Sequence, residues 1–85
     1  MKIEMAKSLR GHDKDEIYVI YKKDESFVFL INGDNKTLNH MKKKKQKHIQ
    51  VIKNLPQEVL ECLSGKTEMT DELARKVTKI YLRSQ

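Results

Sequence analysis

The sequence predicts a mainly β fold: a small five-stranded barrel over residues 1–54, followed by a pair of short α-helices over residues 55–85 that packs on the barrel. Two observations predict it. Short β-branched and aromatic runs, separated by turn signals, recur through the first part of the chain, which is typical of small barrels. After Asn54 the apolar residues change to helical spacing and are flanked by helix-capping residues.

Five segments are expected to be strands. Residues 1–9 alternate loosely between apolar and polar side chains, as in a half-exposed first strand. Residues 17–21 and 27–31 are β-branched and aromatic, and their spacing fits a hairpin. The turn sequence Asn-Gly-Asp-Asn after residue 31 predicts that a fourth strand begins at residues 36–38, and residues 49–52 supply the fifth.

The two central strands are apolar on both faces. One face of each can fill a small barrel, so the other face needs a second cover. The helical segments can supply this cover, because their apolar residues fall on one face each: Val59, Leu60 and Leu63 in the first, and Leu73, Val77, Ile80 and Tyr81 in the second.

Capping residues delimit both expected helices. Pro56 suits the first turn of one helix, and Gly65 can end it. Thr70 is the expected N-cap of the other, with Asp71 and Glu72 in its first turn, where the helix dipole favours anions.

Composition argues against an enzyme. With 85 residues, of which 38% are apolar, the core is too modest for a deep substrate pocket. The three histidines show no metal-ligand spacing, and the one cysteine, Cys62, lies in the apolar pattern of the first helix, where a buried, inert thiol is expected. There is no phosphate-binding glycine motif. We therefore expect no catalytic residue, no metal and no cofactor.

The apolar runs also limit the cellular context. The longest, at residues 17–21 and 27–31, have five residues each, which is too short for a signal peptide or a membrane span. A single cysteine cannot form an internal disulfide. These features lead us to expect a cytoplasmic monomer with no membrane partner.

Positive charge is concentrated in one segment. Residues 36–54 hold seven lysines and no acid, whereas residues 1–35 have six basic and seven acidic residues, and residues 55–85 have five of each. The formal net charge of +6 therefore comes from this segment, which predicts binding to a polyanion, nucleic acid above all. A lysine run is commonly just a solvated loop or tail. Here it leads directly into the apolar residues 49–52, which favours a tethered basic loop between two ordered strands.

The order of these parts resembles the small KOW-domain RNA-binding proteins of bacteria, which are related to large-subunit ribosomal proteins of archaea and eukaryotes. The matching segments are Gly-His-Asp-Lys at 11–14 before the strand, Phe-Val-Phe-Leu at 27–30 running into Asn-Gly-Asp at 32–34, and the lysine-rich residues 42–49. The resemblance covers about residues 5–52, and the segment Met-Thr-Asp-Glu at 69–72 also looks like that family's. It implies an SH3-like barrel that binds RNA, with ribosomal RNA as the expected target and ribosomal proteins as candidate further partners.

The chain departs from this family in its first turn. The family's turn usually reads Gly-Arg-Asp-Lys-Gly, and here His12 replaces the arginine and Asp15 the second glycine. A mostly neutral histidine cannot grip a phosphate as arginine does, so the lysine loop is expected to carry more of the affinity. The expected RNA-binding residues are Arg10, Gly11, His12, Lys14, Lys42, Lys43, Lys44, Lys45, Lys47 and His48.

The aromatic residues could offer stacking faces to bases. Most of them, Tyr18, Phe27, Phe29 and Tyr81, are expected in the core, because they fall within apolar patterns. Tyr21, next to two lysines, is the best candidate for an exposed ring.

Two other functions are compatible with the sequence. One is a protein-interaction adaptor that uses the barrel groove and the helical tail, with the basic loop meeting an acidic protein. The other is a DNA-binding helix-turn-helix in the tail. It is less favoured, because the second helix starts with acidic residues where groove contacts usually lie.

Overall fold

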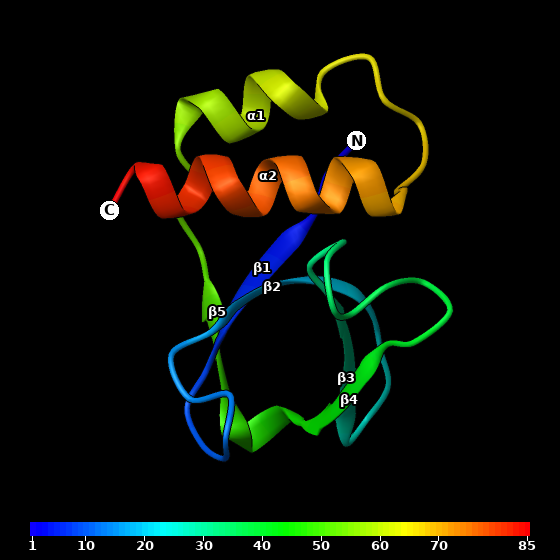
Figure 1. The fold of residues 1–85 in the computed structure, drawn as a ribbon, viewed down its shortest axis with the longest axis vertical. Coiled ribbons are helices and arrows are strands. Elements are labelled where there is room, and N and C mark those ends of the chain that lie inside the picture. Colours follow the sequence, from blue (N-terminus) through cyan, green and yellow to red (C-terminus); the bar gives the residue numbers. More distant parts are fainter.

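The structure is a computed structural model that describes residues 1–85. Five antiparallel strands form one curved sheet in the order β4-β3-β2-β1-β5, and two helices lie together on one side of it (Figure 1). The strands are β1 (Glu4–Ser8), β2 (Ile17–Lys23), β3 (Phe27–Ile31), β4 (Lys42–Lys45) and β5 (Ile49–Ile52), and the helices are α1 (Gln57–Leu63) and α2 (Asp71–Arg83). A short 3-10 helix, η1 (Gln46–His48), joins the two edge strands. The predicted fold class, mainly β with a small five-stranded barrel followed by two short helices, is confirmed, and the five strands form a half-barrel.

Each face of the sheet carries a cluster of buried side chains. Because side chains alternate along a strand, Tyr18 and Ile20 of β2 point into the half-barrel, while Ile17 and Val19 point outward to the helices. The inner cluster has six buried residues and the outer cluster eleven, so most of the buried apolar surface lies between the sheet and the helices. Burying one such side chain contributes about 1.5–3 kcal/mol. The helices cover the second face of the central strands at Ile17, Val19 and Ile31, as predicted, but they do not extend over the outer face at the start of β3.

The helix ends follow from local chemistry. Thr70 precedes α2 in an extended conformation, and its hydroxyl accepts a hydrogen bond from the Leu73 amide at 3.1 Å, which confirms the predicted N-cap. α1 follows Pro56 and ends at Leu63; Gly65, with a φ of +78°, turns the chain after it. Neither helix has the length and apolar character needed to cross a membrane.

The position of the fourth strand differs from the prediction. Residues 36–38 form no strand; Thr37 makes only an isolated bridge with His40. The lysine run itself is β4, which pairs with β3 over Lys42–Lys45, so the predicted basic loop is an edge strand followed by η1. An edge strand tolerates lysines because their aliphatic stems lie on the sheet while their ammonium groups reach water.

The segment between β3 and β4 instead reaches α2. The Asp71 carboxylate accepts a hydrogen bond from the Leu38 amide at 2.8 Å, and Arg75 Nε donates to the Gly33 carbonyl at 3.0 Å. Gly33 is buried there with a φ of +74°. These contacts fix the barrel to the start of α2.

Candidate nucleic-acid interface

The four lysines of β4 point to two different sides of the sheet. Lys42 and Lys44 lie opposite Leu30 and Val28, whose side chains are buried inside the half-barrel. Lys43 and Lys45 lie opposite Phe29 and Phe27, on the outer face. The lysine run therefore presents two pairs of charges rather than one continuous group.

Lys44 is held in a nearly buried ion pair. Its Nζ lies 2.8 Å from Asp13 Oδ1, and the two side chains are only 10% and 14% exposed. The same ammonium group donates a hydrogen bond to the Arg10 carbonyl at 2.8 Å. Because its charge is compensated within the fold, we leave Lys44 out of the proposed contact surface.

Asp13 is the centre of this network. Its carboxylate also accepts hydrogen bonds from the Tyr18 hydroxyl at 2.8 Å and from Ser8 Oγ at 3.0 Å. Burial alone would raise the pKa of Asp13, but the hydrogen bonds from Lys44, Tyr18 and Ser8 outweigh it and lower the pKa to about 2. Burial and the bond to this carboxylate raise the pKa of Tyr18. Asp13 thus stays ionised and joins the first turn to β2 and β4.

Lys42 has acidic surroundings. It is half-buried and lines a polar cleft of about 450 Å³, together with His12 and three acids, Asp13, Glu16 and Asp34. A phosphate entering this cleft would meet carboxylates as well as ammonium groups. The cleft is therefore a poor place for a polyanion.

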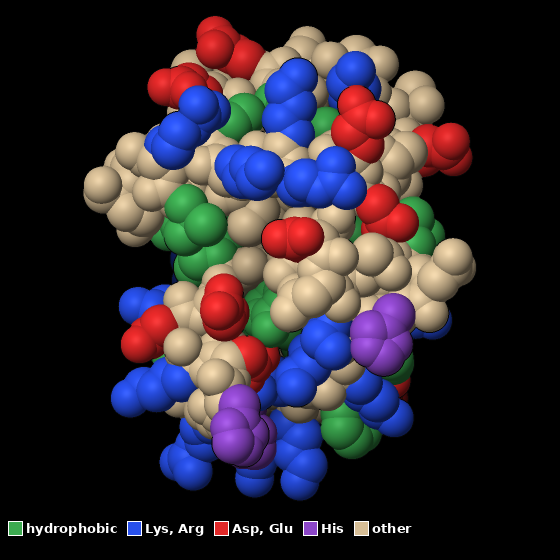
Figure 2. Space-filling model, viewed as in Figure 1, with side chains coloured by type: hydrophobic (Ala, Val, Ile, Leu, Met, Phe, Trp, Pro, Cys, Tyr) green, Lys and Arg blue, Asp and Glu red, His purple; other side chains and the backbone are tan.

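Uncompensated positive charge gathers at the end of the barrel farthest from the helices. The Leu9 amide donates to the His48 carbonyl at 2.9 Å, which brings the start of the first turn beside η1. We call Arg10, Lys45, Lys47 and His48 the basic end. Figure 2 shows Lys and Arg side chains crowded in the lowest part of the view, whereas basic and acidic side chains are mixed around the helices.

Two features show that the charge at the basic end is not neutralised. Arg10, Lys45 and Lys47 are exposed, and none of them takes part in the three ion pairs of the structure. Desolvation and then the surrounding charges of Arg10, Lys47, Lys45 and Lys44 lower the pKa of His48. This end of the barrel therefore carries a local positive field.

The remaining expected residues lie in the turn between β1 and β2. Gly11, His12 and Lys14 are exposed there, and Gly11 has a φ of +91°. Asp15, where the family resemblance would put glycine, has a φ of +74° and forms an ion pair of 3.7 Å with Lys7. Aspartate is one of the few residues besides glycine that enters this region.

A second candidate surface lies on the outer face of β3 and was missed by the sequence reasoning. Phe27 and Phe29 were expected in the core, and that expectation is wrong: both rings are half-buried and belong to neither buried cluster. Lys43 Nζ lies 4.3 Å from the centroid of Phe27, and Lys22 Nζ lies 4.8 Å from that of Phe29. The run Phe-Val-Phe-Leu-Ile is apolar on both faces, so it predicts that Phe27 and Phe29 share one face of the strand, but the sequence does not show where the helical cover of that face stops.

The other tyrosines fall where the sequence indicated. Tyr18 is buried in the inner cluster, and Tyr81 packs partly buried against the outer one. Tyr21 is 46% exposed, as predicted.

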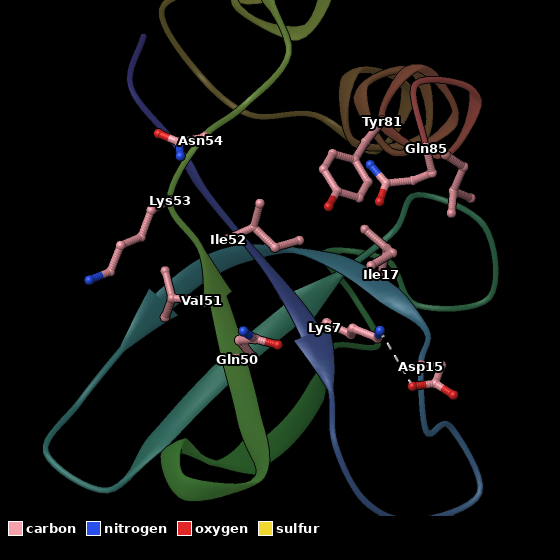
Figure 3. Close-up of a pocket in the computed structure, with 11 residues that line it drawn as sticks. Lys7, Asp15, Ile17, Gln50, Val51, Ile52, Lys53, Asn54, Tyr81 and Gln85 are labelled. Carbon is pink, nitrogen blue, oxygen red and sulfur yellow. Dashed lines mark ion pairs between the residues drawn. The ribbon is translucent and has the colours of Figure 1, made fainter.

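A shallow groove of about 790 Å³ lies between the β1–β5 pair and the end of α2 (Figure 3). It differs from the basic end in its charge. In this view Lys7 reaches across to Asp15, and Tyr81 hangs from α2 above the strands. Its charges are partly compensated, since the Lys7–Asp15 pair forms one side. No group of three or more His, Cys, Asp or Glu residues in the structure could hold a metal ion.

Compared with models of known protein families and with curated proteins, the chain matches none. The resemblance to KOW-domain proteins therefore stays a prediction from the residues quoted above.

Proposed function

We propose that this protein binds RNA through the basic end, with structured ribosomal RNA in the cytoplasm as its target. The observation that carries the proposal is the cluster of Arg10, Lys45, Lys47 and His48, which is held on ordered backbone without carboxylate partners. The ordered backbone holds these cations close together, so the backbone needs little further ordering when they meet the phosphates of a folded RNA.

The binding mode follows from the residue types. Lysine and arginine displace condensed counterions from phosphates, and each contact adds about 0.7 to the salt dependence on a single strand. Phosphate contacts position the protein but read no sequence. Recognition of structured RNA depends largely on shape, phosphates and 2′-hydroxyls. We therefore expect strong dependence on salt and modest dependence on RNA sequence.

The test is a charge-matched pair of variants. Arg10→Gln/Lys45→Gln/Lys47→Gln removes three charges from the basic end, and Lys66→Gln/Lys76→Gln/Lys79→Gln removes three exposed charges near the helices. The first should weaken binding to structured RNA by about tenfold or more at low salt, and the second by much less. Equal losses would mean that only net charge matters, and the proposed interface would be wrong.

An adaptor function is the second candidate, and one observation favours it. A groove of about 900 Å³ between β2 and α1 has three large exposed apolar side chains, Met1, Tyr21 and Leu60, which are 38%, 46% and 47% exposed. Exposed apolar side chains that share a groove are typical of protein contacts. A captured partner that survives nuclease treatment but is lost in Tyr21→Ser/Leu60→Ser would favour this function over RNA binding.

The helix-turn-helix alternative has less support. The first turn of α2, which would have to enter a DNA groove, packs instead against the segment between β3 and β4 through Asp71 and Gly33. Measuring the affinity for duplex DNA and for structured RNA at one salt concentration distinguishes DNA binding from RNA binding. A preference for DNA would overturn our ranking.

A further inference from the structure

We propose that Phe27 and Phe29 form a platform on which two unpaired nucleotide bases stack, while Lys22 and Lys43 contact the phosphates of the same strand. This inference rests on the proposed RNA binding and names the form of RNA that is bound. It assigns a role to the outer face of β3, which is separate from the basic end.

The platform exists because the cover of the sheet is incomplete. Phe27, Phe29 and Ile31 alternate along β3 and so share its outer face. Ile31 is fully buried beneath the helices, but the two phenylalanines lie outside that cluster and are half-buried. A five-residue strand therefore keeps one end of its outer face under the helices and presents two aromatic rings at the other end.

The lysines show that the ring faces are accessible. The exposed side chains of Lys43 and Lys22 place their ammonium groups 4.3 Å and 4.8 Å from the centroids of Phe27 and Phe29. An ammonium group can stand there only if no protein atom covers the ring. At exposed sites such a cation–π contact is weaker than the stacking of a base on an aromatic ring. A base can therefore displace the ammonium group, whose flexible stem then reaches a neighbouring phosphate.

The geometry also specifies the ligand. Side chains two residues apart on a strand are about 6.6 Å apart, so the rings can hold two successive bases of an extended strand that are not stacked on each other. In a duplex the base faces are hidden, so the platform selects loops, bulges and single strands. Lys45 lies opposite Phe27 in the sheet, so the platform adjoins the basic end without sharing its residues.

One carboxylate lies near the platform. Asp24 Oδ1 accepts hydrogen bonds from the amides of Ser26 and Phe27 at 2.9 and 2.8 Å, and Lys43 and Lys22 contribute to lowering its pKa. These two hydrogen bonds lower the pKa of Asp24 most, so they both stabilise its negative charge and hold the carboxylate in the turn. Asp24→Asn keeps the turn and removes the charge. It should raise the affinity for single-stranded RNA.

The first experiment uses a single tryptophan as a reporter, because the chain contains none. Phe27→Trp places the indole on the platform, and Tyr81→Trp places it on α2 as the control. Single-stranded oligoadenylate should quench the fluorescence of the first variant strongly and of the second little. Inorganic polyphosphate, which has no bases, should bind without this quenching. Equal quenching by both polymers, or none by the RNA, would overturn the platform.

The second experiment separates this inference from the proposed function. Phe27→Leu/Phe29→Leu keeps apolar side chains on the sheet but removes the aromatic faces. It should lower the affinity for single-stranded RNA by about tenfold or more and the affinity for polyphosphate by less than about twofold. If RNA binding falls in the basic-end variant but is unchanged in this one, the platform is wrong and the RNA-binding proposal stands. If the wild-type protein does not bind RNA, both are wrong.

Discussion

The Lys44 ammonium group lies 2.8 Å from the Asp13 carboxylate, and both side chains are largely buried. One of the four consecutive lysines is therefore part of the fold rather than of the surface that meets a ligand. The pair connects the turn after β1 to the edge strand β4, and so it also holds Arg10 near η1. In this way a buried ion pair positions the exposed charges of the basic end.

Replacing Lys44 should destabilise the fold, whereas replacing its neighbour should not. Lys44→Met leaves the Asp13 carboxylate without its cation in a mostly buried site, and we expect the free energy of unfolding to fall by about 2 kcal/mol. Lys45→Met changes an exposed side chain and should stay within about 0.5 kcal/mol of the wild type. Urea unfolding of both variants makes the comparison. Similar losses in the two would contradict the assigned role of the pair.

Acid should weaken the same network. The pKa of Asp13 is about 2 in the folded protein, against 3.8 ordinarily. Because the folded pKa is depressed, the stabilisation is present above pH 3.8 and is lost as the pH falls toward 2. At about 1.4 kcal/mol per pKa unit, the stabilisation amounts to roughly 2.5 kcal/mol. The stability gap between the wild type and Asp13→Asn, measured by urea unfolding, should narrow between pH 5 and pH 2.5. A gap that is constant with pH would count against this account.

The features that the sequence predicted well depend on nearby residues. The two-faced strands at residues 17–21 and 27–31 and the Thr70 cap are examples, because propensity and capping act within a few positions. The strand at Lys42–Lys45 was missed because lysine has low strand propensity, and the segment becomes a strand by pairing with the free edge of β3.

Long-range packing decided the rest of the candidate site. The Asp13–Lys44 pair joins residues 31 positions apart, so no local pattern could reveal which lysine of the run is neutralised. The exposure of Phe27 and Phe29 depends on how far the helices extend over the sheet. The sequence predicted that the lysines act together as one group. Because of these long-range contacts, the exposed charges instead belong to two surfaces, the basic end and the outer face of β3.

Replacing Asp15 with glycine should make the folded protein more stable. A side chain at a φ of +74° carries backbone strain, which is smaller for aspartate than for most residues. The exposed ion pair with Lys7, at 3.7 Å, contributes less than about 1 kcal/mol. We expect Asp15→Gly to be more stable than the wild type by about 0.5 kcal/mol, because the relief of backbone strain outweighs the loss of the exposed ion pair. Asp15→Asn is the control that removes the charge alone. If thermal unfolding gives Asp15→Gly no higher midpoint than Asp15→Asn, the proposed backbone strain at residue 15 is wrong.

Gly33 and Gly65 should respond very differently to alanine. A Cβ on Gly33 would overlap the backbone of Asp71 and Arg75, whereas one on Gly65 would meet nothing within 4 Å. Both have a positive φ, so both substitutions carry backbone strain of about 1–2 kcal/mol. Gly33→Ala should cost more than about 3 kcal/mol, since it also forces α2 away from the barrel. Comparable thermal midpoints for the two variants would mean that the close contact between α2 and this turn is wrong.

The salt dependence of RNA binding tests the central claim most directly. We propose that exposed cations of the basic end replace counterions on RNA, so a plot of log affinity against log salt should have a negative slope for the wild type. Arg10→Gln/Lys45→Gln/Lys47→Gln removes three contacts and should make that slope shallower by about 2, while Lys66→Gln/Lys76→Gln/Lys79→Gln should leave it nearly unchanged. A slope in the basic-end variant that equals the wild-type slope would contradict the account.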